Sequence, residues 1–200
     1  MYNISNYKKI NLNFSNWLFT FSNGKKGLVL LGFWAFIEPS FWFIAADMPL
    51  ILYSFFAYKK YIKFFLYTII FAIIGVIFSY FLHLIAFDKM HEILLVTPFV
   101  PSEAIMKIND TYDQYGYWGL LWQSFSFMSV KIWISLAVAR EYSMPLFVIL
   151  TGISRAIRFF IVALISMLFG KYFGKYFQKH SILFTALYLI GFIVMLILVE

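Results

Sequence analysis

Long apolar stretches alternate with short polar segments along the chain, and five of these stretches stand out. They cover residues 27–57, 64–87, 115–139, 145–169 and 181–199. A helix needs about 20 predominantly apolar residues to cross a bilayer. The second, fourth and fifth stretches therefore each predict a transmembrane helix. Residues 1–26 carry apolar side chains at helical spacing between asparagines and serines. They are read either as a short helix lying in the membrane interface or as a loosely ordered polar tail.

The first stretch is too long for a single transmembrane helix. As one helix, residues 27–57 would extend about 46 Å, whereas the apolar core of a bilayer is about 30 Å thick. Glu38 and Asp47 lie near its middle, and each has a proline close by. Proline interrupts a helix because it lacks an amide proton. We therefore predict a re-entrant hairpin with its tip at residues 38–47. Its two half-helices would cover residues 28–38 and 48–57.

A competing interpretation of the first stretch is a single short spanning helix over residues 40–57. The distribution of charge favours the hairpin. Residues 88–114 carry five acids and two lysines. Basic segments stay on the cytoplasmic side. If stretches 27–57 and 115–139 are both re-entrant, each of them enters and leaves the membrane on one side. Only then do all the lysine clusters without acids lie in the cytoplasm. We therefore predict two re-entrant hairpins and a cytoplasmic N-terminus. The clustered lysines are Lys8, Lys9, Lys25, Lys26, Lys59, Lys60, Lys63, Lys171, Lys175 and Lys179.

This topology repeats one unit twice in opposite orientations, because each half is a hairpin followed by a spanning helix. Inverted repeats of interrupted segments are typical of secondary transporters, which bind substrate near the middle of the membrane. The predicted fold class is all-α. It is a polytopic helical membrane protein with two inverted repeats, each a re-entrant helical hairpin plus a transmembrane helix. Residues 181–200 add an extra C-terminal transmembrane helix.

Composition agrees with a membrane setting. The 200 residues are 63% hydrophobic, 23% aromatic and 12% charged, whereas soluble domains are about 45–50% apolar and about 25% charged. These values exclude a disordered chain and an ordinary cytosolic enzyme. The chain has no cysteine, which excludes disulfides, thiolate metal sites and a cysteine nucleophile. The net charge of +7 is read as a topology signal and not as a nucleic-acid footprint.

Charged side chains inside the apolar stretches mark a candidate site. The first half supplies acids and the second half supplies bases. They are Glu38, Asp47, Lys131, Arg155 and Arg158. An intramembrane charge costs about 2.5–3.5 kcal/mol on insertion scales, so we expect these groups to face one another or water. Either they are buried ion pairs that lock the halves together, or they line a polar cavity for an anionic headgroup. In the second hypothesis the three bases bind phosphate, while the two acids gate the site and couple it to protons.

The fourth stretch concentrates its polar residues on one side. Arg155 and Arg158 are three residues apart and share a helix face with Thr151 and Ser154. Gly152 on this helix is expected to admit a neighbouring backbone. The three histidines are scattered and match no metal-binding spacing, and no hydrolase, nucleotide-binding or zinc-protease motif occurs. We predict no catalytic residues, no metal and no cofactor.

The charged residues and their neighbours resemble the DedA-like family, also called VTT-domain or SNARE-associated Golgi proteins, and within it the bacterial YqaA-like branch. The similarity covers roughly residues 30–175. The matching positions are a Glu-x-hydroxyl motif with an aspartate nine residues after the glutamate, a lysine at the end of the second hairpin tip, and a Gly-x-x-Arg-x-x-Arg-Phe-Phe motif. In this sequence they are Glu38, Ser40, Asp47, Lys131, Gly152, Arg155, Arg158, Phe159 and Phe160.

The resemblance implies a multi-pass protein of the bacterial inner membrane that flips or scrambles a phosphate-bearing lipid, such as undecaprenyl phosphate or phospholipid. It also implies proton coupling, with membrane lipids as partners, no nucleic acid, and room for a homo-oligomer. The chain then divides into an N-terminal cytoplasmic or interfacial segment (1–26), a DedA-like domain (27–180) and a C-terminal transmembrane helix (181–200). Two alternatives stay open: a non-transporting protein that organises the envelope membrane, and an intramembrane lipid-modifying enzyme.

Overall fold

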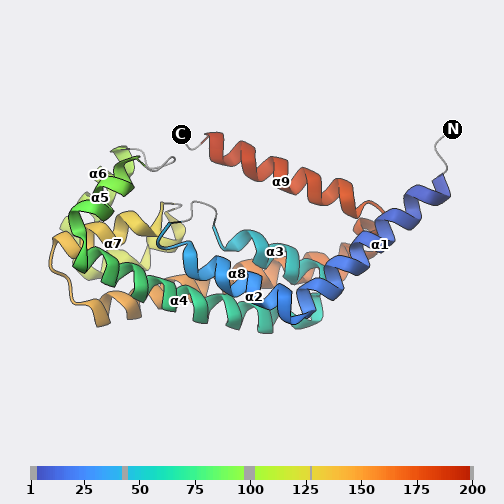
Figure 1. The fold of residues 1–200 in the computed structure, drawn as a ribbon, viewed down its shortest axis with the longest axis horizontal. Helices are drawn as coiled ribbons and strands as arrows, with labels where there is room; N and C mark the ends of the chain where they lie inside the picture. Colours follow the sequence, from blue (N-terminus) through green and yellow to red (C-terminus); the bar gives the residue numbers. More distant parts are fainter. Residues whose placement is uncertain (1–3, 42–44, 97–101, 127, 199–200) are drawn as a thin grey trace.

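The computed structural model describes residues 4–41, 45–96, 102–126 and 128–198. Within these ranges the chain is helical and contains no strand (Figure 1). The predicted all-α class is therefore confirmed. The N-terminal segment forms helix α1, Ile4–Asn23, which confirms its helical interpretation. Its position in a membrane interface stays a prediction.

The first apolar stretch is broken into two helices, as predicted. Helix α2 covers Lys25–Ile37 and helix α3 covers Asp47–Phe56. Residues 42–44, within the connection, lie outside the described residues. Pro39 follows directly on the end of α2, and Pro49 lies in the first turn of α3, where the missing amide proton breaks no helical hydrogen bond. The hydroxyl of Tyr53 on α3 donates a hydrogen bond of 3.2 Å to the carbonyl of Gly27 on α2.

In the part of the chain that the structure describes, two helices are long and apolar enough to cross a membrane. One is α4, Tyr61–Ile85, which follows the short 3₁₀ helix η1, Tyr58–Lys60. The other is α8, Met144–Gln178, which continues beyond the predicted end at residue 169. The outward faces of both helices expose large apolar side chains such as Ile70 and Ile165, which is typical of contact with lipid. A further apolar helix, α9, covers Ser181–Leu198.

The second predicted hairpin differs from the first. Its second arm is α7, Val130–Ala139, but its first arm consists of two 3₁₀ helices, η2, Gly116–Leu121, and η3, Gln123–Phe125. The expectation of an α-helical first arm over this part of residues 115–139 is therefore wrong. The η2 helix opens at Gly116, which has a φ of 54°, a conformation that glycine adopts without strain. The second arm is fully helical and almost completely buried.

The acidic segment 88–114 forms two helices where a loop was expected. They are α5, Phe87–Val96, and α6, Ser102–Tyr115. Helix α6 buries Ala104, Ile108 and Tyr112, which recur every fourth residue, and exposes its acids. The buried Tyr112 hydroxyl donates a hydrogen bond of 2.9 Å to the carbonyl of Trp133 on α7. Burial raises the pKa of Tyr112 above its ordinary value, so this donor keeps its proton. The buried face of α6 packs against α7 and η2.

Each long helix packs against both halves of the chain. Helix α4 contacts α2 of its own half and α7 of the other, whereas α8 contacts η2 of its own half and α3 of the other. The helices α4 and α8 also pack against each other. In each half the first arm packs on that half's long helix and the second arm packs on the long helix of the other half, and α3 also contacts α4 of its own half.

Two glycines allow the closest of these contacts. A Cβ on Gly75 of α4 would lie 2.2 Å from the carbonyl oxygen of Phe36, and one on Gly170 of α8 would lie 2.2 Å from that of Phe55. Gly152 does not act in this way. A Cβ on Gly152 would have the side-chain Cδ1 of Ile73 as its nearest heavy atom, at 3.5 Å. The expected approach of a backbone at Gly152 is therefore wrong, because α4 presents a side chain there.

Helix α9 is held at its N-terminal end. The Ser181 hydroxyl donates a 2.7 Å hydrogen bond to the Asn11 carbonyl, and the Ile182 amide donates one of 3.1 Å to the Asn11 side chain. Phe184 stacks on Phe55 of α3 at 4.9 Å between ring centroids. Beyond these contacts α9 runs apart from the other helices in Figure 1. The hydrogen bond from the Tyr188 hydroxyl to the Met48 carbonyl connects α9 to the start of α3.

Candidate functional site

Two ion pairs join the first hairpin to α8. A guanidinium nitrogen of Arg155 donates to Glu38, and one of Arg158 donates to Asp47. The predicted meeting of acids from the first half with bases from the second is therefore confirmed. The three-residue spacing on α8 puts both guanidinium groups on the side that faces the hairpin.

The hairpin places its two acids by its local structure. Glu38 is the residue at which α2 ends, and Asp47 is the first residue of α3. A carboxylate at the start of a helix is stabilised by the partial positive charge of the helix N-terminus. Both acids thus lie at the turn between the half-helices, and one helix can pair with both. The polar face of α8 is confirmed too, because Thr151 and Ser154 are fully buried.

Lys131 is a third buried cation of the candidate site. It is the second residue of α7 and is 4% exposed. The Arg155 guanidinium lies over the Phe159 ring, 5.1 Å from its centroid. Among the described residues, Lys131 Nζ and the Nε and Nη1 atoms of Arg155 have no hydrogen-bond partner. The candidate site therefore contains one buried cation, Lys131, beyond its two ion pairs.

The Asp47–Arg158 pair is tied to the first arm of the second hairpin. Arg158 donates a second hydrogen bond, of 2.8 Å, to the Ser124 carbonyl. The Ser124 amide in turn donates to the Ser154 hydroxyl at 3.2 Å, and that hydroxyl donates to the Leu121 carbonyl at 2.9 Å. The polar face of α8 thus supplies the partners that the irregular 3₁₀ arm needs for its backbone.

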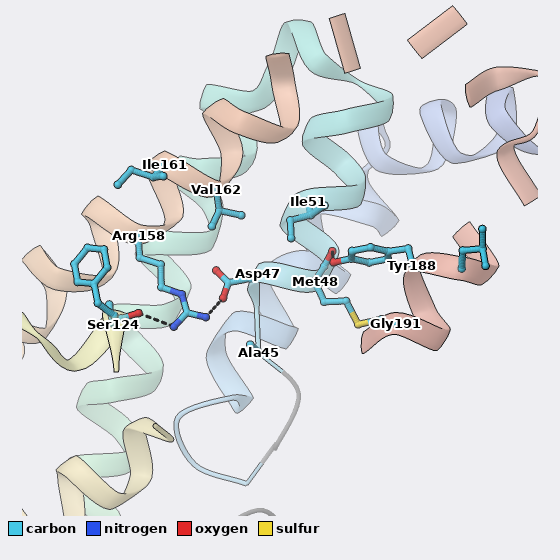
Figure 2. A pocket seen from close by; sticks show the side chains of 12 residues that line it. Ala45, Asp47, Met48, Ile51, Ser124, Arg158, Ile161, Val162, Tyr188 and Gly191 are labelled. Atoms are coloured by element: carbon cyan, nitrogen blue, oxygen red, sulfur yellow. Dashed lines mark hydrogen bonds and ion pairs between the residues drawn. The ribbon is translucent and has the colours of Figure 1, made fainter. Parts of the chain in front are cut away.

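A cavity of about 560 Å³ lies beside the Asp47–Arg158 pair (Figure 2). It is bounded by α3, η3, α8 and α9, and this volume is within the usual range for ligand pockets, about 300–1,000 Å³. Asp47, Arg158 and Ser124 form its polar wall. Most of the remaining wall is apolar and includes Met48, Ile51, Phe125, Ile161, Val162 and Leu187. Such a cavity suits a ligand with one polar end and one apolar end.

Helix α9 supplies a wall that the sequence did not indicate. Leu187, Tyr188 and Gly191 line the cavity, and the Tyr188 hydroxyl donates a 3.3 Å hydrogen bond to the Met48 carbonyl. By hydropathy alone, residues 181–199 are no more than a plain span. The signal that identifies Tyr188 is a hydroxyl in the middle of an otherwise apolar stretch. Ser124 carries a comparable signal, because it lies in a run of neutral polar residues inside an apolar stretch.

The five predicted residues form two groups. Asp47 and Arg158 line the cavity, whereas Glu38, Lys131 and Arg155 are not among its lining residues. A single cluster of three bases around one phosphate therefore does not describe this arrangement. The sequence could not reveal this division, because it depends on which side of α8 each hairpin end meets. In the part of the chain that the structure describes, no three His, Asp or Glu side chains are grouped as a metal site would need.

Comparison of the chain with protein-family models, with curated proteins and with solved structures gives no significant match.

Proposed function

We propose that the chain is an integral membrane protein of the DedA-like type that moves a phosphate-bearing lipid across the bilayer, as a flippase or scramblase. The carrying observation is a partly buried Asp47–Arg158 pair on the wall of a mostly apolar cavity. The planar guanidinium of Arg158 suits the oxygens of a phosphate. The apolar walls of α3, α8 and α9 suit the hydrocarbon chain. Glu38 and Asp47 remain the proposed gating and proton-coupling groups.

The proposed setting is the bacterial inner membrane, with the N-terminus in the cytoplasm. Helices α4, α8 and α9 would span, and the two hairpins would re-enter as inverted repeats. Two observations support the repeats. Each long helix packs on the first arm of its own half and the second arm of the other. Each also carries a serine that donates to a carbonyl of its own hairpin, Ser79 to Pro39 at 3.0 Å and Ser154 to Leu121 at 2.9 Å.

Labelling of single cysteines tests this topology, because the chain has no cysteine of its own. Lys26, Lys59 and Asp110 are exposed and are replaced one at a time by cysteine. We expect an impermeant thiol reagent to reach Lys26→Cys and Lys59→Cys from the cytoplasmic side only, and Asp110→Cys from the opposite side only. Labelling of positions 26 and 59 from opposite sides would show that residues 27–57 cross the membrane.

Lipid movement in vesicles tests the site. We expect the purified protein to translocate fluorescent phospholipid, and the Arg158→Ala and Asp47→Asn variants to do so about 10–100 times more slowly. This range corresponds to the loss of a charge-assisted hydrogen bond of about 1.5–3 kcal/mol. Arg140→Ala is the matched control, because Arg140 pairs with Asp113 and Asn109 away from the cavity. Undiminished movement in both site variants would rule out a role for this pair.

One observation favours the non-transporting alternative. The two ion pairs satisfy four of the five charges within the protein, as expected if they only lock the first hairpin to α8. Folded, purified protein that moves no lipid of any kind would support that function. Release of phosphate from lipid under the same conditions would instead indicate the intramembrane enzyme.

A further inference from the structure

The charges on the wall of the cavity cancel. Of the described residues that line it, Asp47 and Arg158 are the charged ones, and they are paired with each other (Figure 2). The surplus cation of the candidate site, Lys131, is not among the residues that line the cavity. A headgroup in this cavity therefore meets one cation and one anion side by side.

A purely anionic headgroup fits this wall poorly. To reach the Arg158 guanidinium, its phosphate has to compete with the Asp47 carboxylate. Once it is bound, two anions share one cation within mostly apolar walls. An uncompensated charge in such surroundings is strongly unfavourable, because the walls cannot solvate it. Undecaprenyl phosphate, a phosphate monoester without a cation, would meet this obstacle in full.

A zwitterionic headgroup does not leave such an unpaired charge. Its phosphate pairs with Arg158 while its ammonium pairs with Asp47, so one ion pair is exchanged for two and the net charge of the cavity stays zero. Asp47 has an unused acceptor for this partner. Its Oδ2 receives the Arg158 hydrogen bond, whereas its Oδ1 is buried without a hydrogen-bond partner among the described residues, so the side chain has to turn toward the cavity to reach an ammonium. The Asp47 side chain is 12% exposed, and it lies on the cavity wall facing Arg158 (Figure 2).

We propose that the cavity selects zwitterionic phospholipids, which carry an ammonium group beside the phosphate ester, over purely anionic lipids. This selectivity rests on the proposed function and narrows its substrate class. Asp47 is the residue that sets the preference, through its charge. Arg158 binds the phosphate of either class.

The test compares phospholipids with identical, tail-labelled chains and different headgroups. Vesicles containing the purified full chain receive phosphoethanolamine, phosphocholine or phosphoglycerol lipid. We expect the two zwitterionic lipids to move about ten times faster than the anionic phosphoglycerol lipid, a difference of about 1.4 kcal/mol, because the anionic headgroup leaves one charge unpaired within mostly apolar walls. Equal rates, or faster movement of the anionic lipid, would overturn the selectivity while leaving the proposed function intact. Movement of none of the lipids would overturn both.

Removing the charge of Asp47 should abolish the preference for zwitterionic lipids or reverse it. In Asp47→Asn the wall carries one net positive charge, so we expect the ratio of phosphoglycerol to phosphoethanolamine movement to rise about tenfold or more relative to the unmodified chain. Asp47→Glu should keep the original preference, because it keeps the charge. Asp110→Asn, an exposed site outside the cavity, should leave the ratio unchanged. An unchanged ratio in Asp47→Asn would contradict the role given to Asp47, and the comparison in the unmodified chain stands even if the variant does not fold.

Discussion

Replacement of Glu38 by alanine is expected to lower the free energy of unfolding by about 3–5 kcal/mol, the usual effect of removing one partner from a buried ion pair. Glu38 is the carboxylate that pairs with Arg155. The Arg155 and Glu38 side chains are only 5% and 14% exposed. Without the carboxylate, the Arg155 guanidinium stays buried with no anion beside it. Thermal or chemical unfolding of the purified protein in detergent micelles measures the change.

The matched control is another glutamate. Glu103 pairs with Lys107 on the surface of α6, with side chains 75% and 65% exposed. Exposed pairs of this kind contribute about 0–1 kcal/mol, so Glu103→Ala should shift the unfolding transition very little. If Glu38→Ala were no more damaging than Glu103→Ala, Glu38 would not be the counter-charge of the buried Arg155 guanidinium.

The sequence predicted the charged site better than it predicted the cavity. Burial of charge is so unfavourable in an apolar segment that acids and bases placed there must meet, and Glu38, Asp47, Arg155 and Arg158 do meet. Which acid pairs with which base could not be predicted, because it depends on the geometry of the turn between α2 and α3. The cavity could not be predicted either, since one of its walls comes from α9, far from α3 along the chain.

The prediction for the acidic segment 88–114 was wrong for a different reason. Its charges led to the expectation of a loop, although Ala104, Ile108 and Tyr112 already had a helical spacing. This spacing indicates a helix only if its apolar face has a partner to pack against, and α7 is such a partner for α6. The 3₁₀ arm of the second hairpin has a similar cause. Its backbone is satisfied by Ser154 and Arg158 of α8, and no local pattern records those partners.

Helices α3 and α8 come into close backbone contact at Gly170. Alanine is about 1 kcal/mol better than glycine in a helix interior, so a Gly→Ala change on α8 should stabilise the protein if no neighbour intervenes. Gly170 has such a neighbour: its Cβ would lie 2.2 Å from the Phe55 carbonyl oxygen and 2.9 Å from the carbonyl carbon. The backbone of α3 would have to move away, and overpacking of this kind costs about 1–3 kcal/mol or more. We therefore expect Gly170→Ala to lower the unfolding temperature.

At Gly174, one turn further along α8, we expect the same substitution not to lower the unfolding temperature. No atom lies within 4 Å of its Cβ position, so Gly174→Ala should leave the unfolding temperature unchanged or raise it slightly. Gly75→Ala should behave like Gly170→Ala, because its Cβ would meet the Phe36 carbonyl oxygen at 2.2 Å. The three variants differ only in what the new methyl group meets. Equal effects at positions 170 and 174 would mean that α3 and α8 are not in close backbone contact, and the Asp47–Arg158 pair that this contact positions would then lose its support.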